Sequence, residues 1–428
     1  MRKIVTDIKN NIILKEEDIV DNKNSNNVIK IYPDKEITTY LGMGAGITES
    51  VGYNYDKLSS LNKNKILNDC YSKSGLNLDY GRISIGSNDF TIKSYEYSKK
   101  KDLSDFNIEH DKLYIIPMLK EILKIKKISL IASPWSPPKM YKRLRLLRYG
   151  TKLKKRYYDK YSDYLIKFID EYNKEGIKID YLTPQNEPMA RQRWESCKFN
   201  LLEQKDFVYN YLIPKLKDTK ILLFDHNKDN IYHIFKELYE KNKKIAGLAF
   251  HYYSGSYFDN IKKIHMEYPD IILASTESCC GYSPYDEKSW IHDAEIITRD
   301  IIGDMNSGTN LYVYWNLLLD KYGGPTYIKN YVKSPIILDD GNYIKTPIYY
   351  YLYHINHFVS KNSKIIYSEC FNNELKVLSF KNKENIITII MNDNNKDYQY
   401  NLLINNQYYS DYINQHSIIT YIEKNIHK

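Results

Sequence analysis

The sequence predicts an α/β protein in which a (β/α)8 barrel carries an appended antiparallel β-sandwich built from both ends of the chain. Three observations lead to this prediction. Eight short apolar runs follow one another between residues 41 and 318, helix-like stretches separate these runs, and a second set of short strands begins near residue 335. The expected division is the first sandwich strands at 1–40, the barrel at 41–334 and the rest of the sandwich at 335–428.

The eight runs have the composition of buried parallel strands. They are rich in β-branched and aromatic residues, and they are continuously apolar instead of alternating, as is typical of strands covered on both faces. In chain order they are LGMGAGI (41–47), YGRISIG (80–86), KISLIAS (127–133), IDYLTPQ (179–185), ILLFDHN (221–227), IAGLAFHYY (245–253), IILASTE (271–277) and LYVYWNLL (311–318).

Amphipathic stretches lie between these runs. Residues 152–176, 202–218 and 287–308 place apolar side chains three and four positions apart, and Gly176 is a stop signal at the end of the first stretch. An open doubly wound sheet is the alternative, but it requires a Gly-rich phosphate turn that leads into a helix after the first strand. GMGAG lacks the GxGxxG spacing and continues into TES and VGYNY, so the barrel is favoured.

The two ends of the chain supply the predicted sandwich. Short strand-like runs spaced by Asn, Lys and Asp turns are typical of such a domain. The first 40 residues add NNVIKIYPDKEITTY, and the C-terminal part contains IIYSECF, LKVLSFKN, ENIITIIMND, YQYNLLIN and SIITYIEK.

The composition fits a globular protein with a full core. The 428 residues are 43% hydrophobic and 27% charged, and 44 of them are tyrosines, whose flat apolar faces with a polar group suit a sugar-binding cleft. The five cysteines form no CxxC and no zinc spacing, which fits a reducing compartment. We see no signal peptide and no run of about 18 apolar residues, so the expected location is cytoplasmic.

The net charge of +9 has a local source. Residues 139–156 contain nine Lys or Arg residues and no acid. A solvated loop is the simple interpretation of such a run. The functional alternative is attraction to an anionic membrane surface or an acidic substrate, and no nucleic-acid partner is expected.

Polar side chains stand where the predicted strands end. Glu187 follows the fourth strand in LTPQNEP, and Glu277 ends the seventh strand in ASTES. In a barrel the C-terminal strand ends share one rim, where the active site lies. The other candidates on this rim are one Arg, one Asp, one Asn and four ring side chains: Arg82, Asp89, Trp135, Asn186, His251, Tyr253 and Trp315.

Two carboxyl groups on one rim indicate glycoside hydrolysis. At a separation of about 5–5.5 Å, one carboxylate attacks the anomeric carbon while the other carboxyl protonates the leaving oxygen, and the anomer is retained. We expect Glu277 to be the nucleophile, kept ionised by Arg82 and Tyr253. We expect Glu187 to be the acid and then the base, kept protonated near neutral pH by apolar surroundings and by the charge of Glu277. Asn186 would bind the 2-hydroxyl.

The motifs SPWSPPKMYK, LTPQNEP, RWESC, ASTESC and YWNLLLDKYGGP, in this order, resemble glycoside hydrolase family 30, the family of the glucosylceramidases. The resemblance spans about residues 40–360. It implies a retaining β-glycosidase on a barrel fused to a β-sandwich, without cofactor or metal. It also implies that Glu187 is the acid/base, that Glu277 is the nucleophile and that the seven other candidates bind glucose. Asp89 resembles the residue that binds the 4- and 6-hydroxyls, which favours a hexoside over a xyloside.

Two segments depart from the pattern of the family. GMGAGITES differs from the usual double-glycine motif, and the loop after SPP reads KMYKRLRLLRYGTKLK where Gly and Asn are usual. That loop borders the aglycone side of the cleft. The expected activity is that of a β-glucosidase or glucosylceramidase, with β-xylosidase, β-1,6-glucanase and β-fucosidase as alternatives inside the family. A weakly catalytic sugar- or membrane-binding protein is the alternative outside it.

Overall fold

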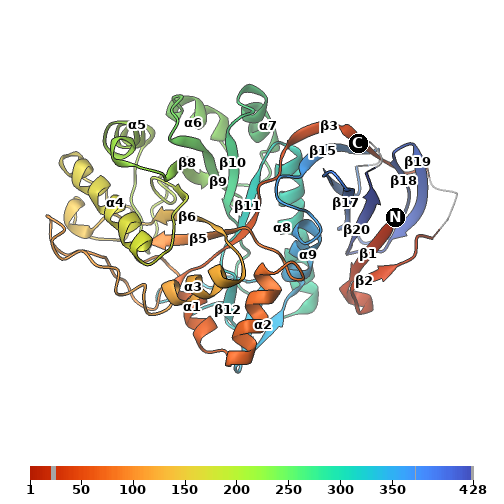
Figure 1. Ribbon diagram of the computed structural model, residues 1–428, viewed down its shortest axis with the longest axis horizontal. Helices are drawn as coiled ribbons and strands as arrows, with labels where there is room; N and C mark the ends of the chain where they lie inside the picture. Colours follow the sequence, from red (N-terminus) through yellow and green to blue (C-terminus); the bar gives the residue numbers. More distant parts are fainter. Residues whose placement is uncertain (21–25, 372, 426–428) are drawn as a thin grey trace.

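The computed structural model describes residues 1–20, 26–371 and 373–425. Eight parallel strands close into a barrel in the order β10-β11-β4-β5-β6-β7-β8-β9 (Figure 1). Each strand overlaps one of the eight predicted runs, and β6 and β8 extend one residue beyond theirs, which confirms the barrel. The strands are β4 (Gly42–Gly46), β5 (Tyr80–Ile85), β6 (Ser129–Pro134), β7 (Tyr181–Leu182), β8 (Lys220–Asn227), β9 (Ile245–His251), β10 (Ile272–Glu277) and β11 (Leu311–Tyr314).

The fourth barrel strand is much shorter than the predicted run 179–185. β7 contains only Tyr181 and Leu182. The chain leaves the ladder near Pro184, which has no N–H to donate to a neighbouring strand. The N–H of Asn186 donates instead to the carbonyl oxygen of Pro134 at the end of β6. The short strand therefore brings the Asn186–Glu187 pair over the barrel opening.

Helices cover the outside of the barrel. The predicted helix over 202–218 is regular only in its first part: α5 is followed by a π-helical segment, Phe207–Leu212, and by a 3-10 turn that contains Pro214. The missing N–H of this proline interrupts the helical ladder. The helices are α1 (Glu49–Asp56), α2 (Ser60–Tyr71), α3 (Ile115–Ile125), α4 (Tyr158–Lys174), α5 (Leu201–Asp206), α6 (Ile231–Leu238), α7 (Phe258–Glu267), α8 (Glu287–Asn306) and α9 (Pro347–Asn356).

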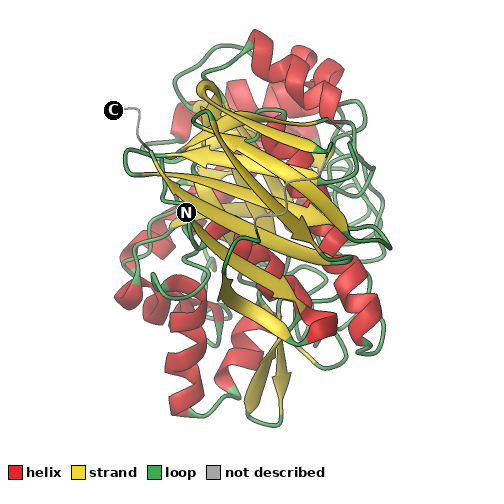
Figure 2. Cartoon of the chain, turned by 90° about the vertical axis from the view of Figure 1, so that its right-hand side faces the viewer, coloured by secondary structure: helices red, strands yellow, loops and turns green. Residues whose placement is uncertain are grey.

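Both chain ends join one nine-stranded sheet beside the barrel, in the order β19-β18-β3-β15-β16-β17-β20-β1-β2 (Figures 1 and 2). The expected sheet is antiparallel, and one pair, β3 with β18, is parallel instead. The strands are β1 (Arg2–Asp7), β2 (Ile12–Glu17), β3 (Val28–Thr39), β15 (Lys364–Cys370), β16 (Lys376–Lys381), β17 (Asn385–Asn392), β18 (Tyr398–Ile404), β19 (Gln407–Ile413) and β20 (Ser417–Lys424).

The strand β19 was not among the predicted elements. It pairs with β18 through a tight turn at Asn405 and Asn406, whose φ angles are 51° and 62°. Two consecutive left-handed residues form the type I′ turn that joins twisted hairpin strands, and asparagine tolerates this conformation. The Asn-Asn pair was the available sequence signal for this hairpin.

The sheet folds over itself to form the two layers of the sandwich. Tyr400 on β18 and Tyr421 on β20 are not on neighbouring strands, yet their hydroxyl groups lie 2.5 Å apart. Tyr421 also donates to Asp411, which receives a second bond from the buried Lys3. The opposite face of the sheet packs on the barrel through α8 and α9. No helix among the described residues is long and apolar enough to cross a membrane.

A small sheet of three strands, β12 (Leu318–Asp320), β13 (Ile336–Asp339) and β14 (Asn342–Lys345), follows the last barrel strand. The division of the chain into parts at residues 40 and 334 stays a prediction. What matters for the site is that the C-terminal ends of β4 to β11 point to one rim of the barrel.

Candidate active site

A cleft of about 450 Å³ opens at this rim. Seven of the nine predicted site residues line it, and the other two, Arg82 and His251, are fully buried directly behind it. The seven lining residues are Asp89, Trp135, Asn186, Glu187, Tyr253, Glu277 and Trp315. The structure therefore brings together side chains from six of the eight strand ends or the loops that follow them.

Glu187 is held in an unusual backbone conformation. Its φ angle is 46°, in the left-handed region that residues with a Cβ rarely adopt. Its N–H donates to the carbonyl oxygen of Asp225 on β8 at 2.9 Å, next to the bond between Asn186 and Pro134 at 2.8 Å. The backbone of two adjacent strand ends thus fixes where the Glu187 carboxyl points.

Glu277, the last residue of β10, has a different environment. The Arg82 guanidinium donates to its Oε2 at 2.5 Å, and the Tyr253 hydroxyl donates to its Oε1 at 2.9 Å. Both bonds stabilise the ionised carboxylate. The two partners that the sequence analysis assigned to Glu277 are therefore in contact with it.

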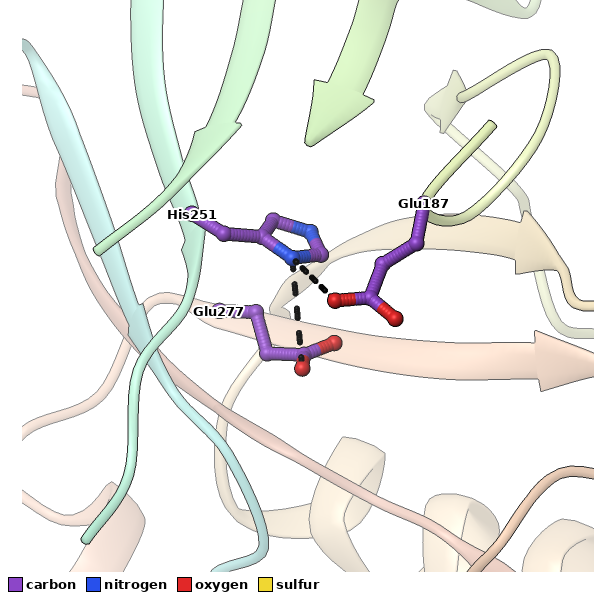
Figure 3. Close-up of side chains that lie close together, drawn as sticks. All are labelled: Glu187, His251 and Glu277. Carbon is purple, nitrogen blue, oxygen red and sulfur yellow. Dashed lines mark ion pairs between the residues drawn. The ribbon is translucent and has the colours of Figure 1, made fainter. Parts of the chain in front are cut away.

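His251 faces both carboxyl groups from one side (Figure 3). Its Nδ1 is 3.8 Å from Oε1 of Glu187 and 4.0 Å from Oε1 of Glu277. One oxygen of each carboxyl and one ring nitrogen all lie within 4.8 Å of one another. This spacing fits the short carboxyl separation of a retaining site.

The same three groups are of the types that bind metal ions. Two positive charges oppose a metal at this point. Arg82 already neutralises Glu277, and the pKa of His251 is raised to about 9. Burial lowers the pKa of this ring, but the charge of Glu277 and the bond to Asp225 outweigh burial. The donor set fits proton and glycosyl transfer better than metal binding.

The pKa shift expected for Glu187 is wrong in its direction. Burial raises the pKa of its carboxyl, but the His251 ring 3.8 Å away, with a smaller contribution from the charge of His226, outweighs burial and holds the pKa below its ordinary value. The sequence analysis considered only apolar surroundings and the negative charge of Glu277. The His251 ring therefore favours the ionised form of Glu187.

Two tryptophans form the floor of the cleft. The rings of Trp135 and Trp315 stack with centroids 5.3 Å apart, and the Arg82 guanidinium lies 5.0 Å from each ring. A Cβ at Gly46 on β4 would approach the Trp315 ring to 2.6 Å, so glycine is required for this close contact. The floor is thus a rigid aromatic surface of the kind that packs against a sugar ring.

The comparison with known proteins agrees with this geometry. The sequence profile of the glycosyl hydrolase family 30 TIM-barrel domain matches residues 40–359, which is most of the chain. The chain belongs to glycosyl hydrolase family 30. It is a glycoside hydrolase, and the resemblance found in its motifs is confirmed.

Relatives within and near this family share nearly the whole architecture. "Putative glucosylceramidase 4" of Caenorhabditis elegans is 30% identical over 90% of this chain and 81% of its own length. The crystal structure of SrfJ from Salmonella typhimurium has a TM-score of 0.94, with 26% identity and 99% of each chain covered. An endo-β1,6-glucanase structure has a TM-score of 0.87, with 27% identity and 98% of each chain covered.

The sequence analysis of this glycoside hydrolase missed Asp225. The residue is fully buried at a β-bulge of β8, and its carboxylate accepts bonds from Arg82 at 2.9 Å, Thr183 at 2.6 Å and Thr276 at 2.6 Å. Its other close contact is Nε2 of His251, at 3.1 Å. Burial raises the pKa of this carboxyl, but the charge of Arg82 and the His251 bond hold it far below the ordinary range. The available signal was an acid inside the apolar run ILLFDHN.

Asn330 and Gln192 were missed for a different reason. Asn330 donates to Oδ2 of Asp89 at 2.8 Å, and Gln192 donates to Oε2 of Glu187 at 3.2 Å. Both lie on loops, where no strand-end pattern marks them. Burial, followed by the charge of Glu277, raises the pKa of Asp89 to about 8. The fold therefore favours the neutral form of Asp89.

Proposed function

We propose that this protein is a retaining β-glucosidase of the glucosylceramidase type. The observation that carries the proposal is a pair of carboxyl groups with one oxygen of each within 4.8 Å of the other, one group against Arg82 and the other against His251. Unlike environments around two close carboxyls are what double displacement requires, because one group must attack while the other transfers a proton.

In the first step, an oxygen of Glu277 forms a bond to the anomeric carbon while the bond from that carbon to the aglycone oxygen breaks. A proton passes from His251 through Glu187 to the departing oxygen, which leaves Glu187 as a carboxylate. In the second step, Glu187 takes a proton from water, the water oxygen attacks the anomeric carbon, and Glu277 leaves. The configuration at that carbon is retained.

The remaining side chains position the sugar. Oδ1 of Asn186 accepts a bond from Arg82 at 2.8 Å, so its NH2 group is left to bind the 2-hydroxyl. Trp135 and Trp315 pack under the ring, and Asp89, with Asn330 beside it, binds the far hydroxyls. Tyr253 holds Glu277 and lines the cleft.

The proposed natural substrate is a glucosylated lipid, which places the enzyme in sphingolipid metabolism. The support is the relative from Caenorhabditis elegans that is named for glucosylceramide hydrolysis. The endo-β1,6-glucanase structure favours a second candidate, hydrolysis of β-1,6-glucan. A panel of soluble aryl β-glucoside, β-xyloside and β-fucoside, with glucosylceramide and β-1,6-glucan, separates these activities and the binding-only alternative.

Azide rescue tests the two roles. For Glu277→Ala, we expect activity on an aryl β-glucoside to be lost and then restored by azide, with an α-glucosyl azide as the product. For Glu187→Ala, we expect azide to give the β-glucosyl azide, because it attacks the glycosyl ester on Glu277. Exchange of these two products between the variants would reverse the assignment, and hydrolysis that persists in both variants would refute it.

A cytoplasmic location is also proposed. Cys70, Cys197 and the adjacent Cys279 and Cys280 are free thiols. Free thiols in this number fit a reducing compartment. Fractionation of the native source, followed by activity assays on each fraction, tests this location.

A further inference from the structure

The segment from Lys139 to Arg156 is a tightly anchored loop beside the cleft. The ammonium group of Lys142 is buried and donates to Oγ of Ser136 at 2.7 Å and to the carbonyl oxygens of Leu147 at 2.9 Å and Ser196 at 2.7 Å. The loop therefore presents a fixed surface to its surroundings.

About half of the basic side chains on this loop have partners inside the molecule. Lys139 pairs with Glu96 at 3.2 Å, Lys152 with Glu203 at 2.9 Å and Lys155 with Asp206 at 2.8 Å. Arg148 lies over the ring of Tyr327 at 4.8 Å. The basic run seen in the sequence is thus not one uniform positive surface.

The loop exposes both apolar and cationic side chains. Leu144 is 69% exposed, Leu146 is 45% exposed and Tyr149 is 48% exposed, and Met189 on the neighbouring loop is 40% exposed. Four exposed arginines lie between and beside them in the chain. We call these residues the cleft collar: Arg143, Leu144, Arg145, Leu146, Tyr149, Met189, Arg191 and Arg193.

The arginines of the cleft collar are not neutralised. Among the described residues, no carboxylate lies within 4.0 Å of any of the four guanidinium groups. Glu195, the nearest acid along the chain, is buried and accepts bonds from Ser87, Ser94 and Tyr327. The collar therefore combines exposed leucines with free positive charge, which a purely solvated loop does not require.

The collar is connected directly to the catalytic residues. The N–H of Tyr149 donates to the carbonyl oxygen of Gln192 at 2.8 Å, and the side chain of Gln192 donates to Glu187. Gln192 and Trp194 line the cleft. Any surface that contacts the collar therefore lies next to the mouth of the cleft on the side of Glu187, where the leaving group departs.

We propose that the cleft collar docks this enzyme on an anionic lipid bilayer, with Leu144 and Leu146 inserted among the headgroups and the arginines against lipid phosphates and carboxylates. Exposed apolar side chains framed by cations are the pattern that binds a membrane interface. The inference rests on the proposed glucosidase function, because it places the cleft mouth at a surface that carries glucosylated lipids.

Vesicle co-sedimentation with the full-length enzyme tests this docking. Vesicles of phosphatidylcholine with about 20% phosphatidylserine are compared with pure phosphatidylcholine. We expect the double variant Leu144→Ser/Leu146→Ser to bind the anionic vesicles at least about tenfold more weakly than wild type. The matched control is Leu61→Ser/Leu202→Ser, which removes two leucines that are 78% and 75% exposed elsewhere, and it should bind like wild type.

A second pair of variants tests how much the arginine charges of the cleft collar contribute to vesicle binding. Arg143→Gln/Arg145→Gln should weaken binding to anionic vesicles and reduce its dependence on salt, whereas Lys241→Gln/Lys243→Gln, on an exposed segment far along the chain, should not. All four variants should keep wild-type turnover of a soluble aryl β-glucoside. Equal binding by wild type and Leu144→Ser/Leu146→Ser, or equal binding to neutral and anionic vesicles, would overturn the docking proposal.

The two proposals fail in different ways. If wild type hydrolyses no soluble glucoside but binds anionic vesicles through the collar, the glucosidase proposal is wrong and the docking surface stands. If wild type hydrolyses the soluble glucoside and the collar variants bind vesicles normally, only the docking proposal is wrong.

Discussion

The carboxylate of Asp225 accepts a bond from Nη2 of Arg82 at 2.9 Å, while Nη1 of the same guanidinium donates to Glu277. One buried acid thus holds the cation that stabilises the proposed nucleophile. The same acid lies 3.1 Å from His251, which faces Glu187. Asp225 connects the environments of both catalytic carboxyl groups without lining the cleft itself.

Asp225→Asn should lower kcat/KM for an aryl β-glucoside by about 10²-fold, because Arg82 and His251 lose their fixed anionic partner. The loss of this charge should also lower the pKa of His251, so the pH profile should change in shape as well as height. Thr183→Val is the matched control, since it removes one bond to the same carboxylate and leaves the charge in place. An unchanged pH profile in Asp225→Asn would mean that the residue has only a structural role.

His251→Gln should move the alkaline limb of the kcat/KM profile to higher pH by about one unit or more. The ring now holds the pKa of Glu187 below its ordinary value, and without the ring the burial of Glu187 should raise this pKa. Glu187 would then keep its proton to higher pH. The measurement is the pH dependence of kcat/KM beside His233→Gln, an exposed control on α6. A limb that stays in place, or moves to lower pH, would contradict this account.

Asp89→Asn should stabilise the protein at alkaline pH. The pKa of Asp89 is raised from 3.8 to about 8 in the fold, so the folded state binds more protons than the unfolded state over this range. Its contribution to stability is present below about pH 4 and is lost as the pH rises through about 8. The asparagine has no proton to lose. The free energy of unfolding of the variant should therefore exceed that of wild type by at least about 1 kcal/mol at pH 8.5, and by much less at pH 5.

Thermal unfolding at the two pH values measures this difference. Activity on the glucoside should fall in the same variant, because a residue of the cleft has changed. A difference in Tm that does not depend on pH would show that Asp89 is not protonated in the empty cleft.

His354 should make the packing of α9 on the nine-stranded sheet less stable at acidic pH. The ring is fully buried, with Nδ1 2.8 Å from the Thr420 hydroxyl and Nε2 2.8 Å from the Thr6 hydroxyl, and burial lowers its pKa from 6.5 to about 3. Between about pH 3 and pH 6.5, the unfolded state therefore binds more protons than the folded state. The stabilising contribution is present above about pH 6.5 and is lost as the pH falls, by up to about 1.4 kcal/mol per unit.

The test compares the free energy of unfolding of wild type and His354→Gln between pH 7 and pH 4, by urea titration. Glutamine cannot charge in this range, so the variant should be less stable than wild type at pH 7 and should lose less stability on acidification. Parallel curves for the two proteins would assign the acid sensitivity to other groups.

The sequence determined much of the fold and most of the site. Eight continuously apolar runs predicted eight barrel strands, because parallel strands are buried on both faces and carry a strong local signal. Barrel geometry then predicted that the polar residues at the strand ends would meet on one rim. All nine candidates, from Arg82 to Trp315, lie in or directly behind one cleft.

Only the tertiary structure decided the contacts, the pKa shifts and the exposure of these groups. It placed Asp225 against Arg82, and it reversed the expected pKa shift of Glu187 through His251. It also paired some of the basic side chains of the loop with acids and left Leu144 and Leu146 exposed. These properties depend on distances between residues far apart in the chain, and electrostatic effects change strongly over a few ångströms in a buried site. The sequence carries residue types and local periodicity, but the fold sets the distances that determine their chemistry.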